Sequence, residues 1–297
     1  MREGRHDRPP IVALETAFLT SGLPDDVRLS TAGAMARAVR EHGAEPAFVG
    51  VVAGEPKVGL DLAGLEQLAR SGGKLSTRDL PVAMARGEDG GTTVAATLFL
   101  AHRGGVGVAA TGGIGGVHPG GTRVDESADL IELSRTPVTL VCSGAKAILD
   151  LPATLERLET LGVTVVGYGT DELPAFWSAE SGLRLPRRVA DACEAAAVSW
   201  EARALGLPGA VLVCVPPPSE DALPAEESER AMARAIVEAG TLGIVGAALT
   251  PFLLSRIAEI TDGRSLRANL ALLTNNASVA AQIAVAETAM SSAAAGA

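Results

Sequence analysis

A lysine that follows a strand-like run is the residue best suited to covalent chemistry. Lys146 ends the segment Ser143-Gly144-Ala145-Lys146, directly after the apolar, β-branched residues 138–142. If a helix begins here, its positive end and a low dielectric favour the neutral amine, which is the form that attacks carbonyl carbons. The pattern therefore predicts a Schiff-base lysine, although most lysines in strand-to-helix loops simply extend into water.

Two groups of carboxylates could assist such a lysine. Glu15 interrupts an apolar run, where burial would raise the pKa of its carboxyl group toward the range of a general acid. A strand-end glutamate that faces solvent is the alternative. Asp125, Ser127 and Asp129 place hard oxygen ligands at alternate positions, which suits Mg²⁺ or Mn²⁺, and a solvated acidic loop is the other interpretation.

A glycine-rich segment supplies a third chemical feature. Residues 111–118 read Thr-Gly-Gly-Ile-Gly-Gly-Val-His, and such glycines let backbone amides approach a phosphate, although a tight turn has the same composition. The dinucleotide-binding fingerprint fits poorly, because His118 stands where the third glycine should fall, so a nicotinamide cofactor is disfavoured. Lys74, in a polar loop, could reach a phosphate, whereas an ordinary surface lysine is the more common case.

The elements that must position these residues alternate between strands and helices. Apolar β-branched runs predict strands, and apolar residues at helical spacing predict helices. The predicted strands are residues 11–19, 47–52, 105–110, 138–142, 163–168 and 210–214. The predicted helices are residues 30–41, 62–69, 92–102, 188–205 and 226–239, one that begins near Asp150, and Ala- and Leu-rich helices from residue 251 onward. This βαβ order predicts a three-layer α/β/α fold with a mostly parallel central sheet, as a single domain over residues 1–297.

Composition limits the class of protein and its partners. With 297 residues, 47% of them hydrophobic, the chain can bury a large core, which excludes a disordered protein. A formal net charge of -10 argues against a nucleic-acid partner. The three cysteines have no disulfide or zinc spacing and the chain starts without a signal-peptide core, so we expect a cytoplasmic protein. No membrane partner is expected, because the apolar run 242–254 is shorter than the roughly 20 residues of a spanning helix.

Taken together, these segments resemble the pseudouridine-5'-phosphate glycosidase family, also called the indigoidine-synthase-A-like family. The resemblance runs in order along nearly the whole chain and is most specific in residues 111–118, in Ser127-Ala128-Asp129-Leu130 and around Lys146 in residues 143–150. It implies an enzyme, a C-glycosidase or lyase, that reversibly cleaves the carbon–carbon bond between ribose 5-phosphate and uracil. It also implies a small phosphorylated sugar or nucleotide as substrate, and a homotrimer.

The resemblance also implies a role for each candidate residue. Lys146 matches the lysine that attacks C1' and holds the opened sugar as an imine, and Glu15 matches the general acid or base. Asp125 matches the ligand of a divalent metal, Mn²⁺ or Mg²⁺. Contacts to the sugar phosphate are implied for Lys74, Val94, Thr111, Ser127, Ala128 and Asp129, and contacts to the base for His118 and Asn269.

Some residues depart from the family's pattern. Ser21-Gly22-Leu23-Pro24 stands where the family usually has His-Gly-Met-Pro, and Pro119, Glu126 and Val215 also differ. These changes spare the lysine, the metal aspartate and the general acid, but they alter a loop that follows Glu15. The family includes C-ribosylating enzymes of antibiotic pathways, as in alnumycin biosynthesis. A C-glycosynthase that attaches ribose 5-phosphate to an aromatic polyketide is therefore the alternative function.

Overall fold

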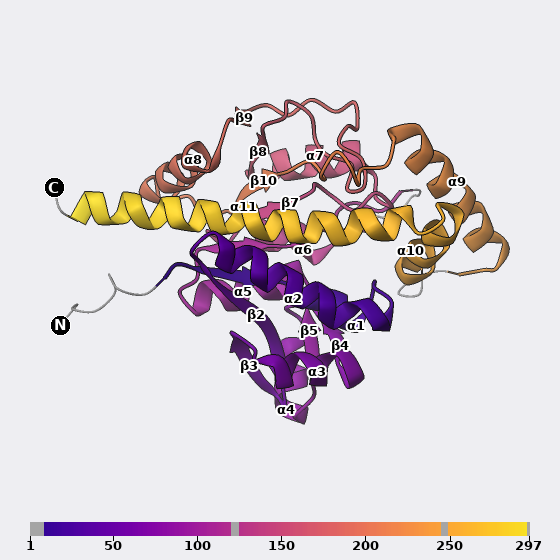
Figure 1. Cartoon of the computed structure of the whole chain (residues 1–297), viewed down its shortest axis with the longest axis horizontal. Helices are drawn as coiled ribbons and strands as arrows, with labels where there is room; N and C mark the ends of the chain where they lie inside the picture. Colours follow the sequence, from indigo (N-terminus) through magenta and orange to yellow (C-terminus); the bar gives the residue numbers. More distant parts are fainter. Residues whose placement is uncertain (1–8, 120–124, 245–248, 296–297) are drawn as a thin grey trace.

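In the computed structural model, the described part of the chain, residues 9–119, 125–244 and 249–295, is built around one ten-stranded sheet (Figure 1). In sheet order the strands are β4 (Gly73–Leu75), β5 (Gly90–Thr92), β2 (Glu45–Val52), β1 (Ile11–Leu14), β6 (Val108–Ala110), β7 (Thr139–Cys142), β10 (Val211–Cys214), β8 (Thr164–Tyr168) and β9 (Arg188–Val189), and β3 (Glu55–Val58) pairs with β2. Within this sheet β2 is antiparallel to β3 and β5, and the other pairings are parallel. The predicted α/β fold with a mostly parallel central sheet is confirmed.

Helices cover both faces of the sheet. On one face α2 (Asp25–Glu41), α8 (Ala192–Ala204) and the long α11 (Arg264–Ala295) pack together, and α11 contacts β1, β6 and β7 (Figure 1). On the other face α5 (Val94–Arg103) packs against α6 (Ala128–Leu133) and against β1, β2 and β6. Because both faces are covered, every residue of β7 and β10 is buried. The remaining helices are α1 (Ala17–Thr20), α3 (Leu62–Ser71), α4 (Leu80–Arg86), α7 (Leu151–Thr160), α9 (Ala225–Thr241) and α10 (Leu249–Ile260).

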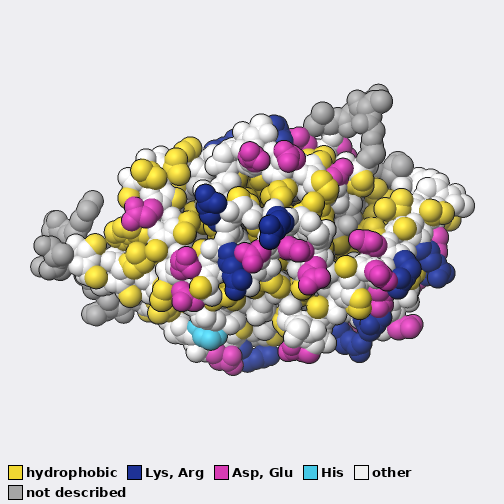
Figure 2. All heavy atoms as spheres, turned by 90° about the horizontal axis from the view of Figure 1, so that it is seen from above, with side chains coloured by type: hydrophobic (Ala, Val, Ile, Leu, Met, Phe, Trp, Pro, Cys, Tyr) yellow, Lys and Arg dark blue, Asp and Glu magenta, His cyan; other side chains and the backbone are white. Residues whose placement is uncertain are grey.

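The surface carries mixed charge. On the face drawn in Figure 2, Lys and Arg side chains are interspersed with Asp and Glu and do not gather into a continuous basic band. Binding to a nucleic-acid backbone would require such a band. Within the described residues, no helix has both the length and the apolar character needed to cross a membrane.

The first predicted strand, residues 11–19, is wrong beyond Leu14. Pairing with both neighbours ends at that residue, which lies opposite Phe48 of β2 and Ala110 of β6. The chain then turns, and the buried residues of α1 form a short helix instead. A short apolar run does not by itself distinguish a buried strand from a buried helical turn, which explains the error.

Three helix starts also differ from their predicted positions; first-turn carboxylates explain one of them and capping explains the other two. α2 begins earlier than residue 30, because Asp25 and Asp26 place carboxylates in its first turn. α5 begins after residue 92, because Thr93 caps it and β5 occupies the preceding residues. α8 begins after residue 188, because Asp191 caps it and β9 lies before it. The other predicted elements lie close to their expected bounds. Residues 1–8 and 245–248 lie outside the described residues. The expectations about the start of the chain and about part of the apolar run 242–254 therefore also fall outside them.

Two of the candidate lysines lie in a local structure other than the predicted one. Lys74 lies on β4, paired with β5, and not in a loop. No helix begins at Lys146: residues 143–149 form bends and turns, and α7 starts only after Asp150, whose carboxylate accepts a hydrogen bond from Ala153 N at 2.9 Å. The prediction that the positive end of a helix lies at Lys146 and favours its neutral amine is therefore wrong.

Candidate active site

Glu15, Thr111 and Lys146 meet at one edge of the sheet because each follows one of three adjacent parallel strands. Glu15 follows β1, Thr111 follows β6, and Lys146 lies a short turn beyond β7. The Glu15 amide extends the pairing by donating to the carbonyl of Ala110 at 3.3 Å. Ligands of open parallel sheets bind outside the carboxyl ends of the strands, so this edge is the expected place for a site.

The backbone pairing of β6 with β7 continues beyond the sheet as far as Lys146. The last bond of this extension is donated by the Lys146 amide to the carbonyl of Ile114 at 3.0 Å. The backbone of Lys146 is thus fixed by strand-like pairing, which replaces the helix that we expected there. The preceding bonds run from Thr111 N to Val141 O at 3.0 Å, from Ser143 N to Gly112 O at 2.8 Å, and from Ile114 N to Gly144 O at 3.0 Å.

Close packing explains why the two loops of this extension contain glycine. A Cβ atom on Gly113 would lie 2.7 Å from the ring of Phe176, and one on Gly144, which has φ +79°, would lie 2.1 Å from the carbonyl oxygen of Pro174. Phe176 is itself a non-glycine residue at positive φ, 63°, and its amide donates to Ser143 O at 3.0 Å. Such a strained backbone at Phe176 persists only where the surrounding structure holds it firmly, and here it is packed against both loops.

A cavity of about 610 Å³ opens at this edge. Its wall includes six of the predicted site residues, Glu15, Lys74, His118, Asp125, Lys146 and Asn269, which come from distant parts of the chain. The other five, Val94, Thr111, Ser127, Ala128 and Asp129, are not among the lining residues, and their contacts to the sugar phosphate remain predictions. The volume is in the range of small-molecule sites. Arg78 and Phe176 also line the cavity and had no predicted role.

The environment of Glu15 suits a proton donor. The residue is buried, and its carboxylate accepts a hydrogen bond from the Thr111 hydroxyl. Burial raises the pKa of Glu15 above its ordinary value, and the negative charge of Asp129 raises it further. Lys146, the Thr111 hydroxyl and Lys74 oppose this shift without cancelling it. The protonated carboxyl group therefore persists to a higher pH than in water.

Lys74 and Arg78 place two cationic side chains at the rim of the cavity. Lys74 is exposed as a whole residue, but its ammonium end faces the cavity, where desolvation and the charge of Lys146 lower its pKa; Glu15 and Asp129 oppose this. Arg78 is exposed and pairs with Asp79 at 3.5 Å. Two such cations suit a phosphate dianion. The short spacing between Lys74 and Arg78 was the sequence signal that could have identified Arg78.

The lysines of this chain are few, and their placement is informative. The sequence contains only Lys57, Lys74 and Lys146, and its other basic side chains are arginines and histidines. Lys74 and Lys146 both line the cavity, whereas Lys57 lies on β3 with its side chain about half exposed. Two of the three lysine side chains are thus at this one site. An amine, unlike a guanidinium, can become neutral and form an imine.

Asp129 has a structural role that the alternating pattern of Asp125, Ser127 and Asp129 did not reveal. Its two carboxylate oxygens accept hydrogen bonds from backbone amides, Ala95 N at 2.9 Å and Gly115 N at 2.8 Å. The Asp129 carboxylate therefore joins the start of α5 to the glycine-rich loop. Ser127 caps α6 by accepting from Asp129 N at 3.2 Å. The Ser127 hydroxyl and the Asp129 carboxylate are thus both engaged in hydrogen bonds to backbone amides.

Replacing Asp129 by asparagine will destabilise the protein. The amide group can accept only one of the two backbone bonds and turns its NH₂ toward the other N–H, so a buried donor loses its acceptor. We expect a loss of about 2–3 kcal/mol in the free energy of unfolding, measured by urea denaturation. The exposed Asp26 on α2 is the control, and Asp26→Asn should change stability by less than about 0.5 kcal/mol. Equal stability of Asp129→Asn and the wild type would contradict the bridging role.

Asp125 fits a hydrated divalent cation better than a closed metal cage. It is exposed, lines the cavity and accepts from the His118 amide only through its backbone carbonyl, at 2.9 Å. Across the described residues there is no group of three or more His, Cys, Asp or Glu side chains that could enclose a metal ion. Mg²⁺ and ions like it commonly use one or two carboxylates, several waters and the substrate's phosphate as ligands. The predicted metal ligand therefore fits such an ion.

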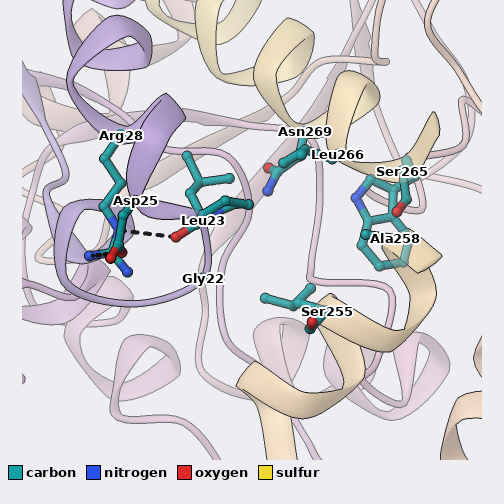
Figure 3. A pocket seen from close by; sticks show the side chains of 12 residues that line it. Gly22, Leu23, Asp25, Arg28, Ser255, Ala258, Ser265, Leu266 and Asn269 are labelled. Atoms are coloured by element: carbon teal, nitrogen blue, oxygen red, sulfur yellow. Dashed lines mark hydrogen bonds and ion pairs between the residues drawn. The ribbon is translucent and has the colours of Figure 1, made fainter. Parts of the chain in front are cut away.

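A side pocket of about 400 Å³ adjoins the cavity and shares Gly22, Leu23, Leu254 and Asn269 with it. In Figure 3, Asp25 and Arg28 pair at one side of this pocket, Ser265 and Ala258 lie at the opposite side, and Asn269 and Ser255 lie between these two sides. Arg28 Nε also donates to Leu23 O at 3.0 Å, which fixes the loop.

Comparisons with known proteins show the family and the fold of the chain. Residues 1–286 match the family described as "Indigoidine synthase A like protein". The pseudouridine-5'-phosphate glycosidase of Methylobacterium nodulans is 54% identical over 93% of this chain and 83% of that protein, and the one of Gemmatimonas aurantiaca is 55% identical over 93% and 90%. An indigoidine synthase A-like protein from Thermotoga maritima has a TM-score of 0.88 at 39% identity, covering 94% of both chains. The prealnumycin C-glycosynthase AlnA, in complex with ribulose 5-phosphate, has a TM-score of 0.88 at 38% identity, covering 96% of this chain and 94% of that one.

Proposed function

The chain belongs to the indigoidine synthase A-like family, and from this premise we propose that it is a pseudouridine-5'-phosphate glycosidase. Such an enzyme cleaves the C-glycosidic bond of pseudouridine 5'-phosphate to give uracil and ribose 5-phosphate. One observation carries the proposal for the site: a lysine and a buried glutamate with a raised pKa line a single cavity at the ends of strands of the sheet, in a chain about half identical to proteins of that name.

The proposed reaction uses Lys146 as nucleophile and Glu15 as the group that moves protons. The neutral Lys146 amine attacks C1', the bond from C1' to the ring oxygen breaks, and Glu15 protonates that oxygen. The proton lost from the nitrogen restores Glu15. The nitrogen lone pair then forms a C=N bond while the bond from C1' to C5 of uracil breaks, and the electron pair left on C5 takes the proton of Glu15. Water hydrolyses the protonated imine, which frees Lys146 and ribose 5-phosphate, and the proton released in this step returns to Glu15.

The remaining cavity residues bind and orient the substrate in this proposal. Lys74 and Arg78 hold the phosphate at the rim, supported by their two positive charges on the same wall. His118 and Asn269 contact the base from the other parts of the wall. Asp125, with water and the phosphate, would hold Mn²⁺ or Mg²⁺, which supplies positive charge to the sugar-phosphate oxygens when bound.

We expect uracil release from pseudouridine 5'-phosphate to depend on a divalent metal ion and on Asp125. After treatment with EDTA, the wild type should release uracil only when Mn²⁺ or Mg²⁺ is added back, as measured by chromatography. Asp125→Ala should lower the rate at least about 100-fold, because it removes the proposed protein ligand of the metal ion, whereas Asp26→Ala should not. No uracil from metal-replete wild type would contradict the function, and a full rate in EDTA would contradict the metal.

The side pocket favours a second candidate function. It adjoins the proposed base-binding wall through Asn269, and its loop is the one that departs from the family's pattern. A C-glycosynthase that joins ribose 5-phosphate to an aromatic ring would use the same lysine and need more room for the acceptor. Imine formation with ribose 5-phosphate, without uracil release from pseudouridine 5'-phosphate, would support this second candidate.

Assembly and location are proposed on other grounds. The homotrimer rests on the family resemblance alone. A reducing, cytoplasmic location is supported by Cys142, Cys193 and Cys214, which are all free, Cys142 and Cys214 lying side by side in β7 and β10 without a disulfide bond.

A further inference from the structure

Asn276 is a buried polar side chain on α11 that the proposed mechanism does not use. Its exposed fraction is 0%, so its amide group must find partners inside the protein. The Nδ2 atom donates to the carbonyl of Thr111 at 2.9 Å and to the hydroxyl of Ser143 at 3.1 Å, with a longer contact to the carbonyl of Gly112 at 3.3 Å. The Ser143 hydroxyl also donates to Asn276 Oδ1 at 3.3 Å.

These partners begin two loops at the catalytic edge of the sheet: the loop after β6, whose Thr111 hydroxyl contacts Glu15, and the loop after β7, which carries Lys146. Thr111 is the first residue after β6, and its hydroxyl donates to Glu15. Ser143 is the first residue after β7 and starts the loop that ends at Lys146. One amide group therefore links the loop whose Thr111 hydroxyl donates to the proton donor Glu15 and the loop that carries the nucleophile. It does so where the pairing between these loops leaves the sheet, at the bond from Ser143 N to Gly112 O.

The helix that carries Asn276, α11, is held in place by packing against two helices and three strands. α11 packs along α2 and α8 and contacts β1, β6 and β7 (Figure 1). Asn269 and Leu273, which line the cavity, precede Asn276 at spacings that place all three on one face of the helix. The same face of α11 thus lines the cavity and holds the loops beside it.

We propose that Asn276 is a positioning residue of the active site, which fixes the loop of Thr111 and the loop of Lys146 relative to each other from α11. The inference rests on the proposed function, because it assumes that Glu15 and Lys146 act on the same substrate. The inference goes beyond the proposed function by giving Asn276 the role of setting the distance between Glu15 and Lys146. Displacing catalytic groups by about 1 Å can cost about 100-fold in rate.

The test compares Asn276→Ala with Asn275→Ala in the full-length protein. Asn275 is the adjacent residue, part-buried, with a single weak contact to Pro216 O at 3.5 Å, so it controls for loss of an amide from the same turn. With pseudouridine 5'-phosphate and Mn²⁺, we expect Asn276→Ala to lower kcat about 10- to 100-fold and to change KM less than about threefold, because binding groups such as Lys74 lie on other elements. Asn275→Ala should keep both constants within about twofold.

The pH profile gives a readout that loss of stability alone would not change. Lys146, Lys74, Asp129 and the Thr111 hydroxyl act on Glu15, and the Thr111 hydroxyl is one of the groups that lower its pKa. If Asn276→Ala weakens the hydrogen bond from the Thr111 hydroxyl to Glu15, the pKa of Glu15 should rise. The part of the pH profile of kcat/KM that reflects ionisation of Glu15 should then move to higher pH. Thr111→Val should move it in the same direction, and adding Asn276→Ala to Thr111→Val should move it no further.

A second variant decides the case in which Asn276→Ala does not fold. Ser143→Ala removes only one hydroxyl and should give a smaller loss of kcat, about 3- to 10-fold, again with KM little changed. The proposal is overturned if folded Asn276→Ala matches Asn275→Ala in kcat and pH profile, or if Asn276→Ala unfolds and Ser143→Ala matches the wild type. Absence of uracil release from the wild type would instead overturn the proposed function.

Discussion

Lys146→Arg should lower the turnover of pseudouridine 5'-phosphate at least about 10³-fold, although the positive charge is retained. A guanidinium stays protonated and cannot form an imine with C1'. The measurement is the rate of uracil release at saturating substrate and Mn²⁺. Lys57→Arg is the matched control, because Lys57 lies on β3 away from the cavity lining, and it should retain the wild-type rate.

The comparison with Lys74 makes this result specific. Lys74→Arg keeps a cation at the phosphate-binding rim, so it should raise KM more than it lowers kcat. A Lys146→Arg enzyme that retains more than about a tenth of the wild-type kcat would show that the amine is not the nucleophile.

Glu15→Gln should lower kcat by about 10²- to 10⁴-fold, the usual contribution of a general acid or base. The amide keeps the shape of the side chain and can still accept from the Thr111 hydroxyl, but it has no proton to give. The exposed Glu55 on β3 provides the control, and Glu55→Gln should leave kcat unchanged. A rate within about threefold of the wild type would remove Glu15 from the reaction.

The same variant should be more stable than the wild type above the pKa of Glu15. The pKa of Glu15 in the folded protein is raised above its ordinary value of 4.5, so the unfolded chain ionises more readily. The stabilising contribution of Glu15 is therefore full below about pH 4.5 and is lost as pH rises through its folded-state pKa. We expect Glu15→Gln to raise Tm by roughly 2–4 °C at pH 8 and by less at pH 4, measured by calorimetry. If Glu15→Gln has a lower Tm than the wild type at pH 8, burial of the ionised Glu15 carboxylate does not destabilise the folded protein as we expect.

The positions of Lys146 and Glu15 could be predicted because they depend on local pattern. Lys146 follows an apolar run that reads as a strand, whereas Glu15 was expected inside the strand 11–19 and follows the end of that strand only because β1 stops at Leu14. In a parallel sheet the residues after such strands gather at one edge. The fold class followed from the same alternation of apolar runs and helical spacing. The predictions that failed concern the ends of helices and strands, such as the helix that we expected at Lys146. The Lys146 amide instead pairs with the carbonyl of Ile114, and this contact between two loops cannot be deduced from local pattern.

Other features of the site depend on tertiary contacts that spacing does not encode. Asp129 reads as a ligand in the sequence, yet its carboxylate is occupied by the amides of Ala95 and Gly115. Phe176 lines the cavity at positive φ, which its residue type does not suggest. Asn276 reads as one polar residue in a long helix, and only the packing of α11 shows that it reaches both catalytic loops.

Reductive trapping tests the central claim most directly. The wild type is incubated with ribose 5-phosphate, Mn²⁺ and borohydride, and the modified peptide is identified by mass spectrometry. The account predicts a reduced sugar-phosphate adduct on Lys146, none on Lys57, and none on Lys74 even though burial and the charge of Lys146 lower the pKa of Lys74. An adduct on Lys74 instead of Lys146, or no adduct from an enzyme that releases uracil, would contradict it.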